Sequence, residues 1–159
     1  MENTKYIPIM IQSLKKKSQI LDTIMGLNQR QRDELENPAL DPSDFDKTVE
    51  EKAAQIDAID ALDVGFQELF DKVKEELSEN RELYREEIAQ MQGCIRDLTE
   101  KSASIQVQEE RNKALMEKKF AAVKRQVKEV RQSQKVVNQY YRSMMKTNFI
   151  DPQFTDKKK

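Results

Sequence analysis

Residues 43–80 read SDFDKTVEEKAAQIDAIDALDVGFQELFDKVKEELSEN and open a stretch of 109 residues, Ser43 to Asp151, that contains no proline and only two glycines. Apolar residues recur every three or four positions along this stretch, which is the spacing of one face of an α-helix. A single helix of this length would extend for about 160 Å at about 1.5 Å per residue. We therefore expect the chain to be almost entirely helical and to fold back on itself.

The composition limits what these helices can enclose. Of the 159 residues, 37% are apolar and 36% are charged, and tryptophan is absent. Such a mixture supports one domain whose apolar surface forms stripes along helices instead of a globular interior. We expect an all-α fold, namely an elongated antiparallel three-helix bundle or coiled coil with a long C-terminal helix.

The first helix is expected over residues 4–36. Pro8 would lie in its first turn, where the missing N–H costs little, and Asn37-Pro38 would end it, because the residue before a proline is pushed out of the α region. Polar positions in an apolar seam usually fix register or partner number at some expense of stability. Three such residues interrupt this seam: Lys17, Asn28 and Gln31.

Residues 37–43 contain two prolines and are expected to form a tight loop between antiparallel neighbours. The second helix is expected over residues 43–77, with Asp41 or Ser43 as its cap. We place the second reversal at residues 78–80, because this ending makes the first two helices similar in length; residues 63–65 and 101–104 remain alternatives. Gly65 is expected to allow close helix packing or a mild kink.

The third helix is expected over residues 81–146. Its first half would pack against both earlier helices, and its second half would overhang them. Around Glu109 and Asn112 the seam becomes polar, which we interpret as the boundary between bundle and extension. Residues 1–146 would then form a single domain, followed by a flexible basic tail, residues 147–159.

The sequence lacks the residues on which most catalytic sites depend. It contains no histidine, and its single cysteine, Cys94, cannot form an internal disulfide and is expected to be a buried structural thiol. Carboxylate pairs such as Glu82 and Glu86 have no glycine-rich loop or enclosed pocket that would raise a pKa. We expect no enzymatic activity, no cofactor and no metal site.

Charge is distributed unevenly along the chain. Residues 43–100 carry seventeen acidic and seven basic side chains, net −10, whereas residues 111–159 carry four acidic and fourteen basic, net +10. These complementary halves are expected to lie side by side. The basic residues ring the helix without a groove-reading motif or stacking aromatics, so nucleic-acid binding is only the third interpretation.

No stretch of the chain has the pattern of a signal or membrane segment. Residues 1–6 lack a basic region leading into an apolar one, and nowhere do about 18 apolar residues follow one another. A cytoplasmic protein without membrane insertion is expected.

Near the C-terminus the chain carries more apolar surface than a two-helix seam covers. Two adjacent tyrosines and two adjacent methionines place apolar groups on more than one helix face: Tyr140, Tyr141, Met144 and Met145. Methionine and tyrosine are adaptable contact residues that recognise amphipathic partner helices. We interpret this region as partner-binding, with packing onto the bundle or homodimerisation as alternatives.

Three features together resemble the FlgN family of flagellar export chaperones, over residues 4–146. They are the three-helix layout, the sequence Glu50-Glu51-Lys52 leading into Ile56-x-x-Ile59-x-x-Leu62-Asp63-x-Gly65-Phe66, and the run Ile105-x-x-x-Glu109-x-x-Asn112. The resemblance implies a cytoplasmic protein that holds hook-associated (hook–filament junction) proteins and delivers them to the flagellar type III export apparatus. It also implies that the C-terminal helix presents an apolar stripe to the terminal helix of this cargo: Val123, Val127, Val130, Val137, Tyr140, Tyr141 and Met144.

The sequence thus predicts a flagellar export chaperone that binds its cargo through the C-terminal helix. The alternative is a structural coiled-coil protein whose C-terminal seam pairs with a second copy of the chain.

Overall fold

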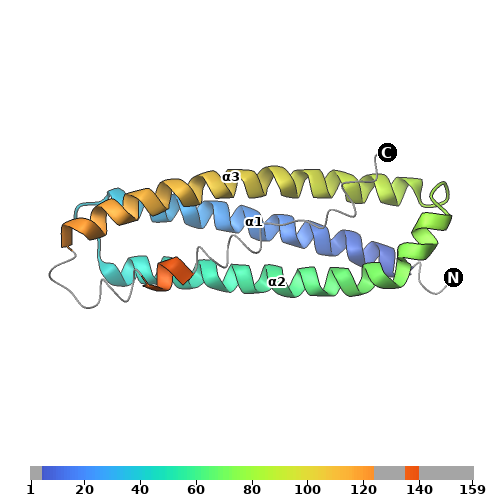
Figure 1. The fold of residues 1–159 in the computed structure, drawn as a ribbon, viewed down its shortest axis with the longest axis horizontal. Coiled ribbons are helices and arrows are strands. Elements are labelled where there is room, and N and C mark those ends of the chain that lie inside the picture. The colour runs from blue at the N-terminus through green and yellow to red at the C-terminus, as the bar shows by residue number, and fades with distance from the viewer. Residues whose placement is uncertain (1–4, 124–134, 140–159) are drawn as a thin grey trace.

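The computed structural model describes residues 5–123 and 135–139 (Figure 1). Three long helices make up nearly all of this part: α1 (Tyr6–Glu36), α2 (Pro42–Glu79) and α3 (Arg85–Val123). They lie along one another, α2 runs antiparallel to both α1 and α3, and the described part contains no strand. The expected all-α helical bundle is confirmed.

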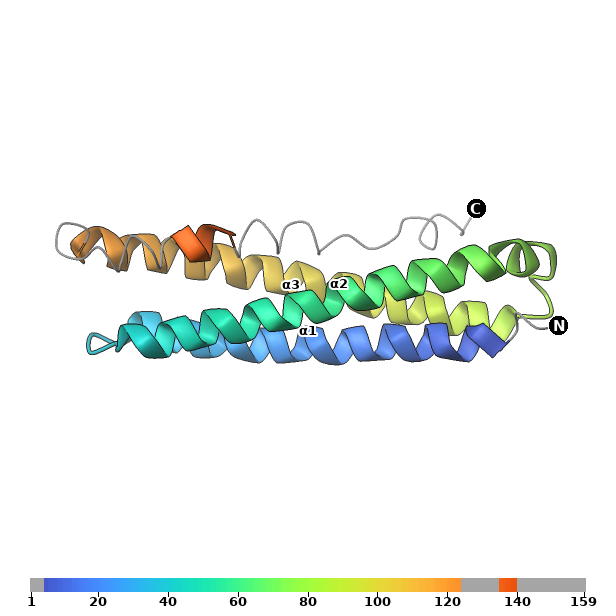
Figure 2. The ribbon, with the colours of Figure 1, turned by 90° about the horizontal axis from the view of Figure 1, so that it is seen from below.

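Helix α1 occupies a central place in the bundle. It packs against both α2 and α3, whereas the Cα atoms of α2 and α3 nowhere approach within 8 Å of each other. Residues 135–139 form a short helical segment that lies level with α2 in Figure 1 and level with α3 in Figure 2. We call this position, diagonal to α1, the fourth corner of the bundle.

The connection between α1 and α2 is a tight turn stabilised by local side chains. The Ala39 backbone N–H donates to Asn37 Oδ1 at 3.0 Å, and the Ser43 N–H donates to Asp41 Oδ1 at 3.0 Å. Asp41 is therefore the residue that caps α2, and Pro42 follows it in the first helical position, where no N–H is needed.

The second reversal lies at residues 80–84, next to the favoured step at residues 78–80. The Asn80 backbone N–H and its side-chain Nδ2 both donate to the carbonyl oxygen of Glu76 at 3.0 Å, which satisfies the end of α2. Tyr84 packs into the core, and its hydroxyl donates to the Glu76 carboxylate. The first two helices thus end at Glu36 and Glu79, and α3 begins at Arg85.

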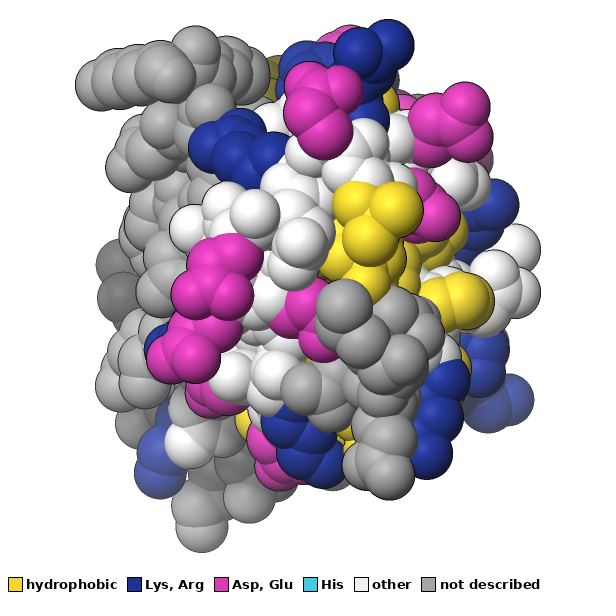
Figure 3. All heavy atoms as spheres, turned by 90° about the vertical axis from the view of Figure 1, so that its right-hand side faces the viewer, with side chains coloured by type: hydrophobic (Ala, Val, Ile, Leu, Met, Phe, Trp, Pro, Cys, Tyr) yellow, Lys and Arg dark blue, Asp and Glu magenta, His cyan; other side chains and the backbone are white. Residues whose placement is uncertain are grey.

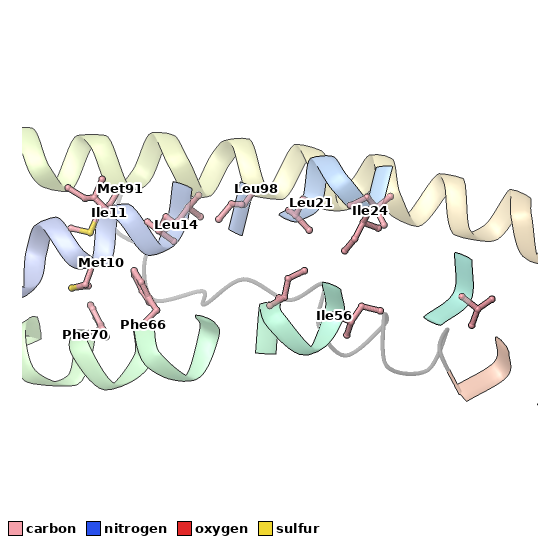
Figure 4. Close-up of a cluster of buried hydrophobic side chains, with 14 of the residues drawn as sticks. Met10, Ile11, Leu14, Leu21, Ile24, Ile56, Phe66, Phe70, Met91 and Leu98 are labelled. Carbon is pink, nitrogen blue, oxygen red and sulfur yellow. The ribbon is translucent and has the colours of Figure 1, made fainter. Parts of the chain in front are cut away.

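The core is a continuous layer between the helices. In Figure 4, apolar side chains of α1 face those of α3 on one side and those of α2 on the other. The labelled members are Met10, Ile11, Leu14, Leu21 and Ile24 of α1, Ile56, Phe66 and Phe70 of α2, and Met91 and Leu98 of α3. Each fully buried side chain of this size contributes roughly 1.5–3 kcal/mol relative to exposure.

Gly65 does not serve close helix packing. It lies within α2, and a Cβ atom added there would meet no atom of the described residues within 4 Å. The expectation of close packing at this residue is therefore wrong for the part of the chain that the structure describes, because no described neighbour approaches it, and the alternative of a mild kink stays a prediction.

The bundle continues past the polar positions of α3. Met116 and Phe120 are buried beyond Asn112, and the Phe120 ring meets the Phe45 ring edge-on, with centroids 5.7 Å apart. The boundary expected around Glu109 and Asn112 is therefore wrong. The polar residues are inside the bundle because α1 and α2 supply partners for them.

The chain after α3 differs from the expected overhanging helix. Helix α3 is described to Val123, and the segment 135–139 lies back over the bundle, level with α2 in Figure 1 and with α3 in Figure 2, instead of extending beyond it. Folding back removes Val137 from water, which a straight extension would leave exposed. The expected tail, residues 147–159, lies outside the described residues.

Candidate partner-binding surface

The fourth corner is the place where the expected partner-binding region meets the bundle. Val137 is 1% exposed and belongs to the same core cluster as the side chains of α1, α2 and α3. Its neighbour Val136 is 48% exposed, and Lys135, Asn138 and Gln139 are exposed too. The segment therefore docks through one side chain and presents the rest of its surface to solvent.

The structure locates two of the eight expected partner-binding residues. Val137 is buried at the fourth corner, and Val123 is the last residue of α3. The other six lie outside the described residues: Val127, Val130, Tyr140, Tyr141, Met144 and Met145. Their grouping into one surface therefore remains a prediction.

A buried polar cluster connects all three helices. Lys52 of α2, 0% exposed, donates from Nζ to Gln31 Oε1 of α1 at 2.9 Å and to Glu109 Oε1 of α3 at 2.8 Å. Asn112 of α3 donates from Nδ2 to the Asn28 carbonyl oxygen at 2.9 Å and to Gln31 Oε1 at 3.2 Å. These five residues, which we call the polar cluster, fix the relative alignment of the helices, since sliding one helix would separate the partners.

Burial changes the proton affinity of Lys52. Its removal from water lowers the pKa from 10.5 to about 8, and the nearby Glu109 carboxylate opposes this shift without cancelling it. The lysine is fully enclosed by the bundle, so the perturbed amine has no access to a substrate. We assign it a structural role.

Cys94 is a free, half-buried thiol that packs against the core. Burial raises its pKa, which disfavours the reactive thiolate. This environment agrees with a structural thiol.

Two further findings concern the described residues alone. No group of three His, Cys, Asp or Glu side chains in this part of the chain is arranged to hold a metal ion. Among the same residues, no helix combines the length and the apolar character needed to cross a membrane.

Comparison with known families decides the assignment. The family model described as FlgN protein matches residues 1–148 of the 159-residue chain. The chain belongs to the FlgN family. FlgN is a family of flagellar export chaperones and is not known as an enzyme family. No curated protein and no solved structure matches the chain significantly.

Several residues of the polar cluster belong to the sequence features by which this chain resembles the FlgN family. Lys52 follows Glu50-Glu51, while Glu109 and Asn112 belong to the run that begins at Ile105. The polar cluster was not predicted from the sequence, in which these positions lie far apart. The available signal was the occurrence of polar residues in the seams of the first and third helices.

The end of the FlgN bundle that carries the turn between α2 and α3 has a mixed surface. Figure 3 shows apolar side chains exposed there among acidic and basic ones. Leu83, in this turn, is exposed, and Lys72 Nζ lies 5.1 Å from the centroid of the Tyr6 ring. Charged side chains interrupt the apolar ones, so this end is a weaker candidate for cargo binding than the C-terminal region.

Proposed function

We propose that this FlgN chain is a cytoplasmic chaperone that binds hook-associated proteins through its C-terminal region and delivers them to the flagellar export apparatus. The observation that carries the proposal is the family match, which covers residues 1–148 and therefore includes the apolar C-terminal cluster. Binding would keep the cargo from assembling before export.

The cargo contact is assigned to the apolar residues of the C-terminal region. They are Val123, Val127, Val130, Val137, Tyr140, Tyr141, Met144 and Met145. A cargo helix laid on this surface would gain about 25 cal/mol per Å² of apolar area buried, reduced by the cost of ordering both partners. Moderate, reversible affinity follows, and export requires reversibility because the chaperone has to release its cargo.

Deletion of residues 140–159 tests this assignment. The deletion keeps every described residue, including Phe120 and Val137 of the core. We expect capture of a purified hook-associated protein in a pull-down to fall more than tenfold, while the circular dichroism spectrum and the thermal unfolding midpoint stay close to those of the full chain. A control replaces the exposed pair Asn138 and Gln139 by alanine, which should leave capture unchanged.

Two outcomes would count against the proposal. Equal capture by the deleted and full chains would remove the cargo contact from residues 140–159. A change in oligomeric state on deletion, measured by light scattering while capture survives, would favour the homodimeric coiled coil.

A further inference from the structure

We propose that residues 135–139 form an autoinhibitory contact: the segment docks at the fourth corner in the free chaperone and leaves it when cargo binds. This inference rests on the proposed function, because it assigns a regulatory role to the same C-terminal region. In the free protein, residues 135–139 of the same chain would then occupy the fourth corner.

The arrangement of the helices explains why the fourth corner needs an occupant. Helix α1 covers one side of both α2 and α3, whose Cα atoms nowhere come within 8 Å of each other. On the side diagonal to α1, the segment 135–139 takes the position of a fourth helix (Figures 1 and 2). Val137 joins the common core there at 1% exposure.

The contact is small enough to be reversible. Of the five described residues in the segment, Val137 alone is buried, and the four around it are exposed. Each of the long helices, in contrast, buries many side chains along its length. Among the described residues of this region, Val137 alone holds the segment to the bundle, so the segment can leave without unfolding the three helices, since elements with few buried contacts open at the lowest cost.

Docking and cargo binding make competing demands on the same residue. Val137 belongs to the apolar set assigned to the cargo helix, and its side chain is already enclosed by the bundle. One side chain cannot be covered by the core and by cargo at the same time. Cargo therefore has to draw the segment away, and the apparent affinity is reduced by the fraction of molecules in the docked state.

Distance measurements between spin labels test this inference on the full chain. Labels are attached at Gln139→Cys and Ala54→Cys, both exposed positions, in a Cys94→Ser background. The free protein should give one narrow distance distribution. Saturation with a purified hook-associated protein should shift this distribution to longer distances and broaden it. A control pair at Thr23→Cys of α1 and Ala54→Cys of α2 should not change.

A pair of valine substitutions tests docking without cargo. In the chain labelled at residues 54 and 139, Val137→Asp should broaden the distribution, because the buried position cannot accept a carboxylate. The matched variant Val136→Asp, at a position that is 48% exposed, should keep it narrow. Equal distributions for the two variants would overturn docking through Val137.

The remaining outcomes separate the inference from the proposed function. A broad distribution in the free protein would show that the segment does not dock. An unchanged distribution with cargo bound, demonstrated by co-elution, would overturn the release step and leave the chaperone function intact. Failure of cargo to bind would overturn the proposed function and the release step together, and the valine variants would still decide docking.

Discussion

Lys52 shows how strongly long-range partners determine the environment of a residue. Its position in the sequence identified it as part of a charged group, Glu50-Glu51-Lys52, which would ordinarily lie in solvent. In the structure it is fully buried, because Gln31 and Glu109 approach it from α1 and α3. No local pattern around residue 52 contains these two partners, so the polar cluster could not be predicted from the sequence of α2.

Replacing Lys52 by methionine should destabilise the bundle by about 3 kcal/mol, because Glu109 would lose the ion pair at 2.8 Å while remaining buried. The free energy of unfolding in urea measures the effect. The double variant Lys52→Met/Glu109→Leu should recover most of the loss, since an apolar pair of similar volume replaces both charges.

A surface ion pair provides the comparison for this prediction. Lys74 and Asp71 lie 3.7 Å apart with both side chains 53% exposed, so Lys74→Met should cost less than about 1 kcal/mol. If Lys52→Met were equally mild, the polar cluster would not contribute to the stability of the fold.

The pKa of Lys52 predicts a dependence of stability on pH. Its value falls from 10.5 to about 8 on folding. Between these two values the unfolded chain holds a proton that the folded chain has released, so the free energy of unfolding should rise with pH. Relative to Lys52→Met, we expect a rise on the order of 1 kcal/mol between about pH 8 and about pH 9.5. A fall over this interval would mean that the ion pair outweighs the cost of burial.

At the level of single helices, α3 departs most from expectation. Its polar positions suggested the end of the bundle, whereas Phe120, eight residues beyond Asn112, is 8% exposed and packs on Phe45. Sequence periodicity identified the helix correctly but could not indicate that α1 and α2 carry complementary polar groups at the same level.

Phe120→Ala should therefore destabilise the protein by about 3–5 kcal/mol, because it leaves a cavity beside the Phe45 ring. Thermal or urea unfolding measures the change, and the exposed neighbour Lys118→Ala should shift the free energy by less than about 0.5 kcal/mol. A loss below about 1 kcal/mol for Phe120→Ala would indicate that this end of the bundle is not packed in solution.

Gly65 in α2 is a position where a substitution should stabilise the protein. The position is helical, and no described residue comes within 4 Å of an added Cβ atom. Gly65→Ala should therefore raise the free energy of unfolding by roughly 0.5–1 kcal/mol, since alanine loses less backbone entropy on folding. A destabilised variant would reveal a steric or functional requirement for glycine at this site.

For the molecule as a whole, the sequence predicted the architecture well because its main signals are local. Asn37-Pro38 and Pro42 mark the first turn, and helical periodicity identifies the three helices. The position of the segment 135–139 could not be predicted in this way. Val137 would show the same spacing in an overhanging helix as in one that folds back, and only the tertiary contacts distinguish the two.

The expected pairing of the acidic and basic halves of the chain stays a prediction, because it depends largely on residues outside the described ones. The described ion pairs between helices run largely through α1, which lies in residues 1–42, a part of the chain with six acidic and six basic side chains. Lys17 pairs with Asp63 at 2.8 Å, Arg30 with Glu51 at 2.9 Å, and Asp22 with Lys101 at 2.9 Å. Helix α1 thus supplies two basic side chains to α2 and one acidic side chain to α3. Most of the basic C-terminal residues lie outside the described ones.

The most direct measurement of the central claim is a calorimetric titration of a purified hook-associated protein into two forms of this FlgN chain. One form is the full chain, and the other has alanine at all four positions of the apolar cluster: Tyr140, Tyr141, Met144 and Met145. We predict at least tenfold weaker binding to the second form with unchanged thermal unfolding. Equal affinity for the two forms would contradict the account.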